Sequence, residues 1–320
     1  MTKKLNVAVQ MDPLEDLTLA GDSTFVIALE AQKRNFNLFH YTPNDLVYKS
    51  GELYARMKRL SLSYHNKVER FDYGKETLKN LSDFNFILMR QDPPFNMNYI
   101  TATHLLEKVS KNTIVVNNPS FVRNSPEKIF VTNFHKLMPE TIITRDLNEI
   151  KSFREKHKDI IIKPLYGNGG EGIFHITNKS DNFNSILEIC FKQYKEQLII
   201  QKYLPEVRKG DKRILLIDGE IVGAVNRVPS SGDSRSNMHA GGTPKKTFIT
   251  KSDVQICNKI SHELKKRELF FVGIDVIGNY ITEINVTSPT GICEINNFNK
   301  TKIEKIFWDK LIEKLVNHQT

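Results

Sequence analysis

The sequence contains no apolar run that approaches the roughly 20 residues of a membrane-spanning helix. Its first residues, 1–9, turn polar too soon to resemble a secretory signal peptide. With neither feature present, we expect a cytoplasmic protein that has no membrane partner.

Cysteine is also scarce. Cys190, Cys257 and Cys293 are odd in number and show neither CxxC nor Cys/His spacing, which argues against a disulfide framework and against a zinc site. We expect reduced thiols. Neither these cysteines nor the nine histidines stand in a recognisable nucleophile setting, so the sequence does not support covalent catalysis by a side chain.

The composition is that of a folded globular protein. With 39% hydrophobic and 26% charged residues and no internal repeat, the chain is not collagen-like, disordered or coiled-coil, and 320 residues predict two or three domains. The net charge of +9 attracts polyanions, either nucleic acid or nucleotide phosphates. Because the basic residues are dispersed without an RNP-like or helix-turn-helix pattern, a nucleic-acid-binding protein is only a remote alternative, and we expect no nucleic-acid partner.

Hydrophobic periodicity divides the chain into three parts. Residues 1–122 alternate strands and helices in the manner of an open parallel sheet, although the polar stretch 48–71 is ambiguous. In residues 123–200, a proline-marked helix start places Lys128 in a first turn, and two strands flank a glycine cluster. Residues 201–320 contain hairpins at 213–227 and 271–286. The following strands and helices are expected: strands 5–10, 36–40, 84–89, 114–116, 159–163, 173–176 and 198–200, and helices 24–35, 100–110, 182–194 and 253–266.

The loop 229–244 is longer than most loops of compact domains. It contains three glycines and four serines but few apolar residues. We therefore interpret it as a mobile lid.

The glycine cluster at 167–172 matches the GxGxxG pattern formally. The dinucleotide-binding fingerprint must open a helix, but here a strand follows, and a Walker loop would need Gly-Lys-Ser/Thr at its end. Because Lys163 precedes the cluster on a strand, the arrangement indicates a hairpin whose backbone N–H groups close over phosphates. Taken alone, the cluster is also compatible with an ordinary surface turn.

Glu283 and Asn285 lie two residues apart on a predicted strand and therefore share a face. A carboxylate and an amide oxygen are ligands that suit Mg²⁺. Asp275 joins them only if the hairpin pairs it with Glu283, which requires an odd-numbered turn, whereas a two-residue turn pairs it with Thr282. The alternative is the polar outer face of an amphipathic strand.

A pair of arginines and the end of an apolar strand are weaker indications of a nucleotide site. Arg213 and Arg227 lie on the two arms of one hairpin and can face the same phosphate, although charged residues at a sheet edge would look the same. Residues 201–204, which follow an apolar strand, suit an adenine that lies against the strand end.

Short motifs along the chain, taken in order, carry a family resemblance. They are Met11-Asp12-Pro13 with Asp22-Ser23, Arg90-Gln91-Asp92-Pro93-Pro94-Phe95, Glu127-Lys128, Ile162-Lys163-Pro164-Leu165, Gly169-Gly170, Gln201-Lys202-Tyr203-Leu204-Pro205, Gly210-Asp211-Lys212-Arg213, Ala240-Gly241-Gly242 and Thr282-Glu283-Ile284-Asn285-Val286-Thr287-Ser288-Pro289-Thr290-Gly291. The ordered set resembles the bacterial type of glutathione synthetase in the ATP-grasp superfamily, and it covers nearly the whole chain.

The resemblance implies an α/β (α+β) ATP-grasp fold, in which an N-terminal open parallel α/β domain precedes two β-rich lobes that enclose ATP. It implies an ATP-dependent ligase, a glutathione synthase, that joins γ-glutamylcysteine to glycine through an acyl phosphate and releases ADP and phosphate. It also implies a homotetramer and Mg²⁺, or Mn²⁺, as the metal. Another ATP-grasp carboxylate–amine ligase with a different acceptor amine is the alternative, because the ATP and metal motifs are common to the superfamily.

The resemblance also assigns roles to residues of this sequence. Tyr166 and Asn168 depart from the Asp and Met expected in the glycine loop, and residues 243–246 replace a Gly- and Arg-containing stretch, which affects the expected lid contacts. The assignments are ATP binding for Lys128, Lys163, Gly167, Gly169, Gly170, Gln201, Tyr203, Leu204 and Asp211; catalysis for Arg213 and Arg227; metal binding for Asp275, Glu283 and Asn285; substrate binding for Asp22, Ser23, Ser288, Pro289 and Thr290; and the lid for Ser231, Gly232, Arg235, Gly241 and Gly242.

Overall fold

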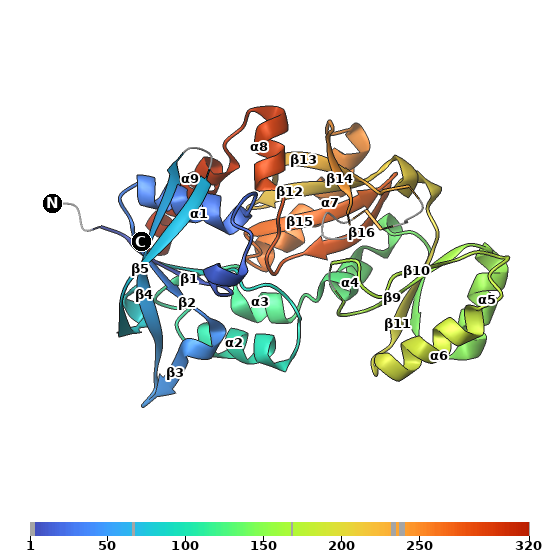
Figure 1. Cartoon of the computed structure of the whole chain (residues 1–320), viewed down its shortest axis with the longest axis horizontal. Coiled ribbons are helices and arrows are strands. Elements are labelled where there is room, and N and C mark those ends of the chain that lie inside the picture. Colours follow the sequence, from blue (N-terminus) through green and yellow to red (C-terminus); the bar gives the residue numbers. More distant parts are fainter. Residues whose placement is uncertain (1–3, 66–67, 168, 232–234, 237–240, 320) are drawn as a thin grey trace.

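The computed structural model describes residues 4–65, 68–167, 169–231, 235–236 and 241–319. Strands of these residues form three sheets of seven, four and five strands. The four-stranded sheet and its helices lie at one end of the long axis of the molecule, the seven-stranded sheet lies at the other end, and the five-stranded sheet lies between them (Figure 1).

The seven-stranded sheet is built around four parallel strands. Their apolar residues are almost fully buried, as expected for strands covered on both faces. In spatial order they are β2 (Asn37–Tyr41), β1 (Asn6–Gln10), β6 (Phe86–Met89) and β7 (Ile114–Val116).

The predicted open parallel sheet is therefore only part of this layer. The ambiguous stretch 48–71 belongs largely to a long antiparallel hairpin, which extends the sheet beyond β2. No residue of its outer strand is buried, whereas the inner strand alternates buried apolar residues, such as Leu53, Ala55 and Met57, with more exposed ones. The antiparallel strands are β3 (Leu46–Lys49), β4 (Glu52–His65) and β5 (Val68–Asn80).

The helices of this part begin at polar capping residues. The Asp22 side chain accepts a hydrogen bond from the Phe25 N–H at 2.6 Å, as an N-cap residue does. Asn96 and Asn118 cap the next two helices in the same way. These helices are α1 (Ser23–Lys33), α2 (Met97–Glu107) and α3 (Pro119–Arg123).

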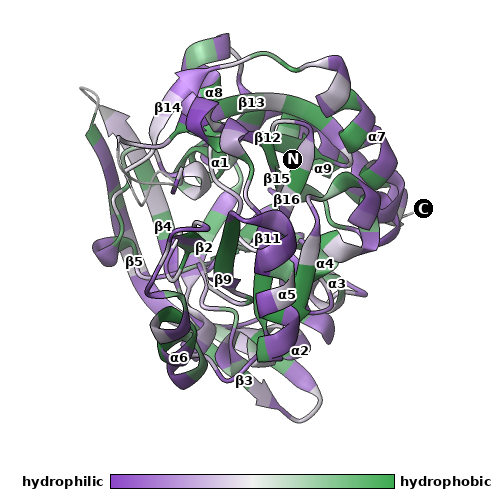
Figure 2. Ribbon diagram, turned by 90° about the vertical axis from the view of Figure 1, so that its right-hand side faces the viewer, coloured by the Kyte–Doolittle hydropathy of each residue, from purple (hydrophilic) through white to green (hydrophobic). Residues whose placement is uncertain are grey.

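The four-stranded sheet is antiparallel in the order β10, β9, β11, β8. Apolar residues of its strands pack against two helices in a separate core, and β9 stands out in green in Figure 2. The short helix α4 (Glu127–Phe130) precedes this sheet, and the proline that marks its start, Pro126, is its N-cap residue. The elements are β8 (Thr141–Thr144), α5 (Leu147–His157), β9 (Ile160–Pro164), β10 (Phe174–Ile176), α6 (Phe183–Gln193) and β11 (Leu198–Lys202).

The five-stranded sheet is antiparallel in the order β14, β13, β12, β15, β16. Both predicted hairpins are present in it. The elements are β12 (Asp211–Ile217), β13 (Glu220–Val228), β14 (Thr243–Lys246), α7 (Lys251–Lys266), β15 (Phe271–Ile277), β16 (Tyr280–Asn285), α8 (Ile292–Asn299) and α9 (Ile303–Gln319).

The last helix returns to the first part of the chain. In α9, the fully buried Trp308 donates its indole N–H to the Ile27 carbonyl at 2.8 Å, and Asp309 pairs with Arg34 at 2.7 Å. The five-stranded sheet is thereby held against the seven-stranded sheet. None of the described helices is both long and apolar enough to span a bilayer.

We propose that 1–122, 123–200 and 201–320 are the three domains. Each sheet lies within one of these ranges, except that β11 continues past residue 200 to Lys202. The packing of α9 on α1 shows that the third range does not stand apart from the first.

Candidate active site

One cavity brings together most of the residues singled out in the sequence. Side chains of the four-stranded and five-stranded sheets line it, with α4 and the segment after β16. The predicted site residues in its wall are Lys128, Lys163, Gly167, Gly169, Gly170, Gln201, Tyr203, Leu204, Asp211, Arg213, Arg227, Arg235, Asp275, Glu283, Asn285, Ser288, Pro289 and Thr290.

The β15–β16 hairpin places Asp275 directly opposite Glu283. The turn is the two-residue Gly278-Asn279, because Ile277 pairs with Tyr280, so the odd-numbered turn is not the cause. A β-bulge leaves Thr282 as the extra residue and shifts the register by one. The predicted pairing is present, but it depends on an irregularity that turn length alone does not show.

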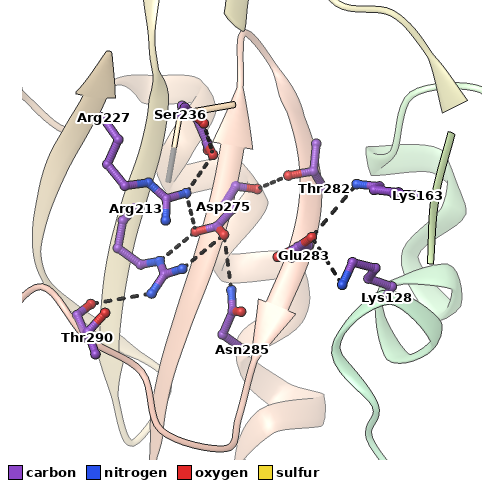
Figure 3. A network of polar contacts seen from close by, with 11 residues as sticks. Lys128, Lys163, Arg213, Arg227, Ser236, Asp275, Thr282, Glu283, Asn285 and Thr290 are labelled. Atoms are coloured by element: carbon purple, nitrogen blue, oxygen red, sulfur yellow. Dashed lines mark hydrogen bonds and ion pairs between the residues drawn. The ribbon is translucent and has the colours of Figure 1, made fainter. Parts of the chain in front are cut away.

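Asp275 is the centre of a buried ion-pair network (Figure 3). Arg213 donates from Nε to Oδ1 at 2.6 Å and from Nη2 to Oδ2 at 3.0 Å. Arg227 Nη2 lies 3.0 Å from the same Oδ1, and Asn285 Nδ2 donates to Oδ2 at 3.3 Å. The two arginines therefore converge as expected, here on a carboxylate. Burial disfavours the charge of Asp275, but the two guanidinium groups more than offset this effect and hold its pKa below the ordinary value.

Two lysines flank Glu283 on the side facing the four-stranded sheet. Lys128 Nζ and Lys163 Nζ each lie 3.8 Å from Glu283 Oε1 (Figure 3). Burial lowers the pKa of Lys163, although the charge of Glu283 opposes this effect. With Arg213 and Arg227, the cavity holds four buried cationic side chains, an arrangement that suits a ligand with several negative charges.

The oxygen ligands present fit a metal that is shared with a phosphorylated ligand. Glu283 and Asn285 line the cavity, and Asn285 retains its amide oxygen because it bonds to Asp275 through nitrogen. Both carboxylate oxygens of Asp275 accept hydrogen bonds from Arg213, so an oxygen of Asp275 that binds a metal must contact the metal and a guanidinium group at the same time. Among the described residues, no cluster of three His, Cys, Asp or Glu side chains could hold an ion. One or two carboxylates plus phosphate oxygens is the arrangement that Mg²⁺ favours.

The glycine loop after β9 needs its glycines. Gly169 and Gly170 have φ of +63° and +82°, in the left-handed region, and a Cβ at Gly167 would lie 2.6 Å from Pro164 Cγ. Lys128 donates from Nζ to the Gly167 carbonyl. The loop leads into strand β10, as predicted, which agrees with the exclusion of a dinucleotide fingerprint.

The loop contains the two departures from the family pattern, Tyr166 and Asn168, and the structure describes only the first of them. The Tyr166 ring faces Phe95 at a centroid distance of 6.3 Å. Asn168 lies outside the described residues. The stretch 243–246, which replaces the expected Gly- and Arg-containing residues, forms the edge strand β14.

The end of β11 forms another part of the wall. Gln201 and Lys202 belong to the strand itself. The Tyr203 N–H donates to the Asp159 carbonyl at 3.0 Å, which leaves the Leu204 N–H as the backbone donor for a predicted adenine.

Asp211 lies at the start of β12 with one oxygen unused. Oδ2 accepts from Arg227 at 2.6 Å and from Ser236 at 2.8 Å, whereas the buried Oδ1 has no partner among the described residues. Burial raises the pKa of Asp211, although Arg227 opposes this effect. A hydroxyl donor such as a ribose would satisfy the free oxygen.

Of the predicted substrate-binding residues, those at 288–290 line the cavity and those at 22–23 do not. Ser288, Pro289 and Thr290 line the cavity, and Thr290 accepts a hydrogen bond from Arg213 at 3.4 Å. Asp22 and Ser23 are not among the lining residues. Asp22 caps α1, and the buried Ser23 hydroxyl accepts from the backbone N–H of Gly291 at 3.2 Å. In this structure, the two residues join α1 to the start of α8 and do not contribute to the cavity.

The predicted lid is only partly described. Arg235 lines the cavity, whereas Ser231, Gly241 and Gly242 do not, and Gly232 lies outside the described residues. The loop ends earlier than expected, because β14 already begins at Thr243.

Sequence reasoning assigned no role to Glu127, which also lines the cavity. It is in the first turn of α4, and its Oε1 accepts from the Thr287 hydroxyl at 3.1 Å. Burial raises its pKa to about 7, although the charge of Lys128 opposes this effect. The Glu127-Lys128 pair is part of the family motif, but nothing in that motif shows that the glutamate faces the cavity.

The raised pKa of Glu127 predicts how stability depends on pH. Between its ordinary pKa of 4.5 and about 7, the folded protein binds a proton that the unfolded chain has released, so the carboxyl increasingly destabilises the fold as pH rises. In Glu127→Gln, this penalty is absent. The variant should therefore gain stability relative to the unmodified protein as pH rises through this window, and the difference should level off above it. Denaturant unfolding at several pH values measures this difference, and a difference that is constant with pH would contradict the prediction.

Comparison with known proteins agrees with this geometry. Two family models match the chain: "Prokaryotic glutathione synthetase, N-terminal domain" over residues 5–123, and "Prokaryotic glutathione synthetase, ATP-grasp domain" over residues 127–300. The glutathione synthetase of Agrobacterium fabrum is 53% identical over 314 residues, which cover 98% of each chain.

Solved structures share the fold at low sequence identity. D-cycloserine synthetase DcsG has a TM-score of 0.66 at 11% identity and covers 96% of this chain and 99% of its own. The ATP-grasp ligase PsnB, in complex with a phosphomimetic precursor variant, Mg and ADP, has a TM-score of 0.59 at 14% identity and covers 97% of this chain and 98% of its own. The three-sheet α/β architecture is the ATP-grasp fold, and the chain belongs to the prokaryotic glutathione synthetase family.

Proposed function

We propose that this chain joins γ-glutamylcysteine to glycine and converts ATP to ADP and phosphate. The observation that carries the proposal is the convergence of Lys128, Lys163, Arg213 and Arg227 around Glu283 and Asp275 in one cavity. Family membership at 53% identity over nearly the full length supports the choice of substrates.

The reaction begins with phosphoryl transfer. The free carboxylate of the cysteine residue attacks the γ-phosphate of ATP, a P–O bond to ADP breaks, and an acyl phosphate forms. This step needs positioning and charge neutralisation, not a protein nucleophile. Lys128 and Lys163 neutralise the phosphates from one side, while Arg213 and Arg227 face the transferred group from the other.

Glu283, Asn285 and one oxygen of Asp275 are proposed to hold Mg²⁺. The ion would supply positive charge that neutralises the phosphates. Mn²⁺ prefers the same oxygen ligands and is the second candidate.

We expect Glu283→Gln to shift the magnesium dependence of the reaction. The amide keeps the size of the side chain but removes a negative ligand, so the Mg²⁺ concentration for half-maximal activity should rise about 10-fold or more, with at most partial rescue at high Mg²⁺. A titration of activity against Mg²⁺ tests this, with Glu149→Gln on the exposed side of α5 as the control. An unchanged titration would remove Glu283 from the metal site.

The remaining roles follow the geometry of the wall. Leu204 would bind adenine, the free oxygen of Asp211 would accept a ribose hydroxyl, and residues 288–290 would lie beside glycine. The loop that carries Arg235 and Ser236 would close over the acyl phosphate, since that intermediate hydrolyses in water. The hydrogen bond from Ser236 to Asp211 supports this position.

Assembly and compartment are further parts of the proposal. The family resemblance leads us to propose a homotetramer, and the need for ATP and a reduced thiol substrate leads us to propose a cytoplasmic location. The mass of the particle in solution tests the first of these.

A ligase with a different acceptor amine is the second candidate, because the ATP and metal motifs are common to the ATP-grasp superfamily whereas acceptor specificity is not. A screen of amino acids with γ-glutamylcysteine, ATP and Mg²⁺ distinguishes the two. Glycine should give the fastest phosphate release. A faster rate with another amine would replace this proposal with the alternative.

A further inference from the structure

Six carboxylate residues line the cavity, and they differ in their partners. Two of them are exposed, and three form ion pairs within 4.0 Å of lysine or arginine side chains. Glu127 is the exception, because it forms no such pair among the described residues and accepts its hydrogen bond from the neutral Thr287 hydroxyl. The six are Asp92, Glu127, Glu171, Asp211, Asp275 and Glu283.

The position of Glu127 relates it to the acceptor side of the cavity. Helix α4 packs against β16, and the hydrogen bond to Thr287 places the carboxyl beside the segment that continues into residues 288–290. In the next residue of the same turn, Lys128 reaches Glu283 at 3.8 Å. Glu127 therefore neighbours the proposed phosphate-binding Lys128 in the chain and is hydrogen-bonded to the segment that leads into the proposed glycine site.

The second half of the proposed reaction needs a base. The amine of a free amino acid is protonated at neutral pH and has no lone pair to attack with. A positioned carboxylate can bind the ammonium group and accept its proton, and it does so best when its pKa is near the working pH. The pKa of Glu127, raised by burial to about 7, meets this requirement.

We propose that Glu127 is a catalytic residue that binds the ammonium group of the acceptor amino acid and takes one proton from it. The amine nitrogen then attacks the acyl carbon, the new C–N bond forms, and the C–O bond to phosphate breaks with its electron pair on phosphate. The second proton of the nitrogen leaves with the phosphate, and Glu127 returns its proton to solvent. This inference rests on the proposed function.

Hydroxylamine separates this role from a role in phosphoryl transfer or in folding. It is a much weaker base than an amino acid amine and is already neutral near pH 7, so it captures the acyl phosphate as a hydroxamate without a protein base. In Glu127→Gln, we expect the maximal rate with glycine to fall about 10²- to 10⁴-fold, while hydroxamate formation from γ-glutamylcysteine, ATP and Mg²⁺ stays within a few-fold of the unmodified enzyme. Glu149→Gln, which changes an exposed glutamate in the first turn of α5, should leave both rates unchanged.

Each other outcome overturns the inference. Equal loss of the glycine rate and the hydroxamate rate would assign Glu127 a role in phosphoryl transfer or in folding. If the variant kept both rates, Glu127 would have no role in catalysis. A higher KM for glycine with the maximal rate unchanged would make it a binding group that is not a base. If the unmodified enzyme itself forms no hydroxamate, the proposed acyl phosphate fails instead.

Discussion

Replacing Asp275 with asparagine is expected to destabilise the protein by about 3–5 kcal/mol. The side chain of Asp275 is 6% exposed, and the carboxylate neutralises both Arg213 and Arg227. Asparagine leaves Arg213 buried without its carboxylate, whereas Arg227 keeps Asp211. Chemical unfolding without ligands measures the change, and the variant should also lose ligase activity.

A matched surface pair provides the control. Asp309 pairs with Arg34 at 2.7 Å, but the Asp309 side chain is 63% exposed, so Asp309→Asn should cost less than about 1 kcal/mol. A double variant that adds Arg213→Met to Asp275→Asn removes the orphaned charge and should be more stable than Asp275→Asn alone. Equal effects of Asp275→Asn and Asp309→Asn would contradict the described network.

Replacing Lys163 with methionine is expected to lower kcat/KM for ATP by about 10²-fold or more. Methionine preserves the packed aliphatic stem, while the charge beside Glu283 and the phosphates is lost. Because burial already disfavours the ammonium group, the variant should remain at least as stable as the unmodified protein. Steady-state kinetics and nucleotide binding by calorimetry measure the two effects.

The control for this variant is Lys75→Met, an exposed change on β5 of another sheet, which should leave nucleotide affinity unaltered. If Lys163→Met binds ATP as tightly as the unmodified protein, Lys163 has no place in the phosphate site.

Local sequence signals predict those parts of the fold that depend on neighbouring residues. The helix expected at 24–35 begins after the capping residue Asp22. The hairpin expected at 213–227 turns at Asp218-Gly219, where both residues adopt the positive φ, 50° and 73°, of a two-residue turn. The strand that follows the glycine cluster is a further example. Each of these features is determined within a few residues of chain.

Features set by tertiary packing are not predictable in this way. The bulge at Thr282 decides whether Asp275 faces Glu283, and a count of turn residues predicts the wrong partner for this turn. Asp22 and Ser23 were expected near the substrate, but α8, more than 260 residues away, uses the Ser23 hydroxyl. Glu127 acquires its place only when α4 packs beside Thr287. Their positions follow from contacts between distant segments, which residue patterns do not record.

The central claim is that one cavity couples ATP cleavage to the joining of γ-glutamylcysteine and glycine. The most direct test measures phosphate release from ATP with Mg²⁺ and γ-glutamylcysteine, with and without glycine, alongside the glutathione formed. We predict that sustained phosphate release requires glycine and that one phosphate appears for each peptide bond. Phosphate release at the same rate without glycine, or without accompanying glutathione, would contradict the account.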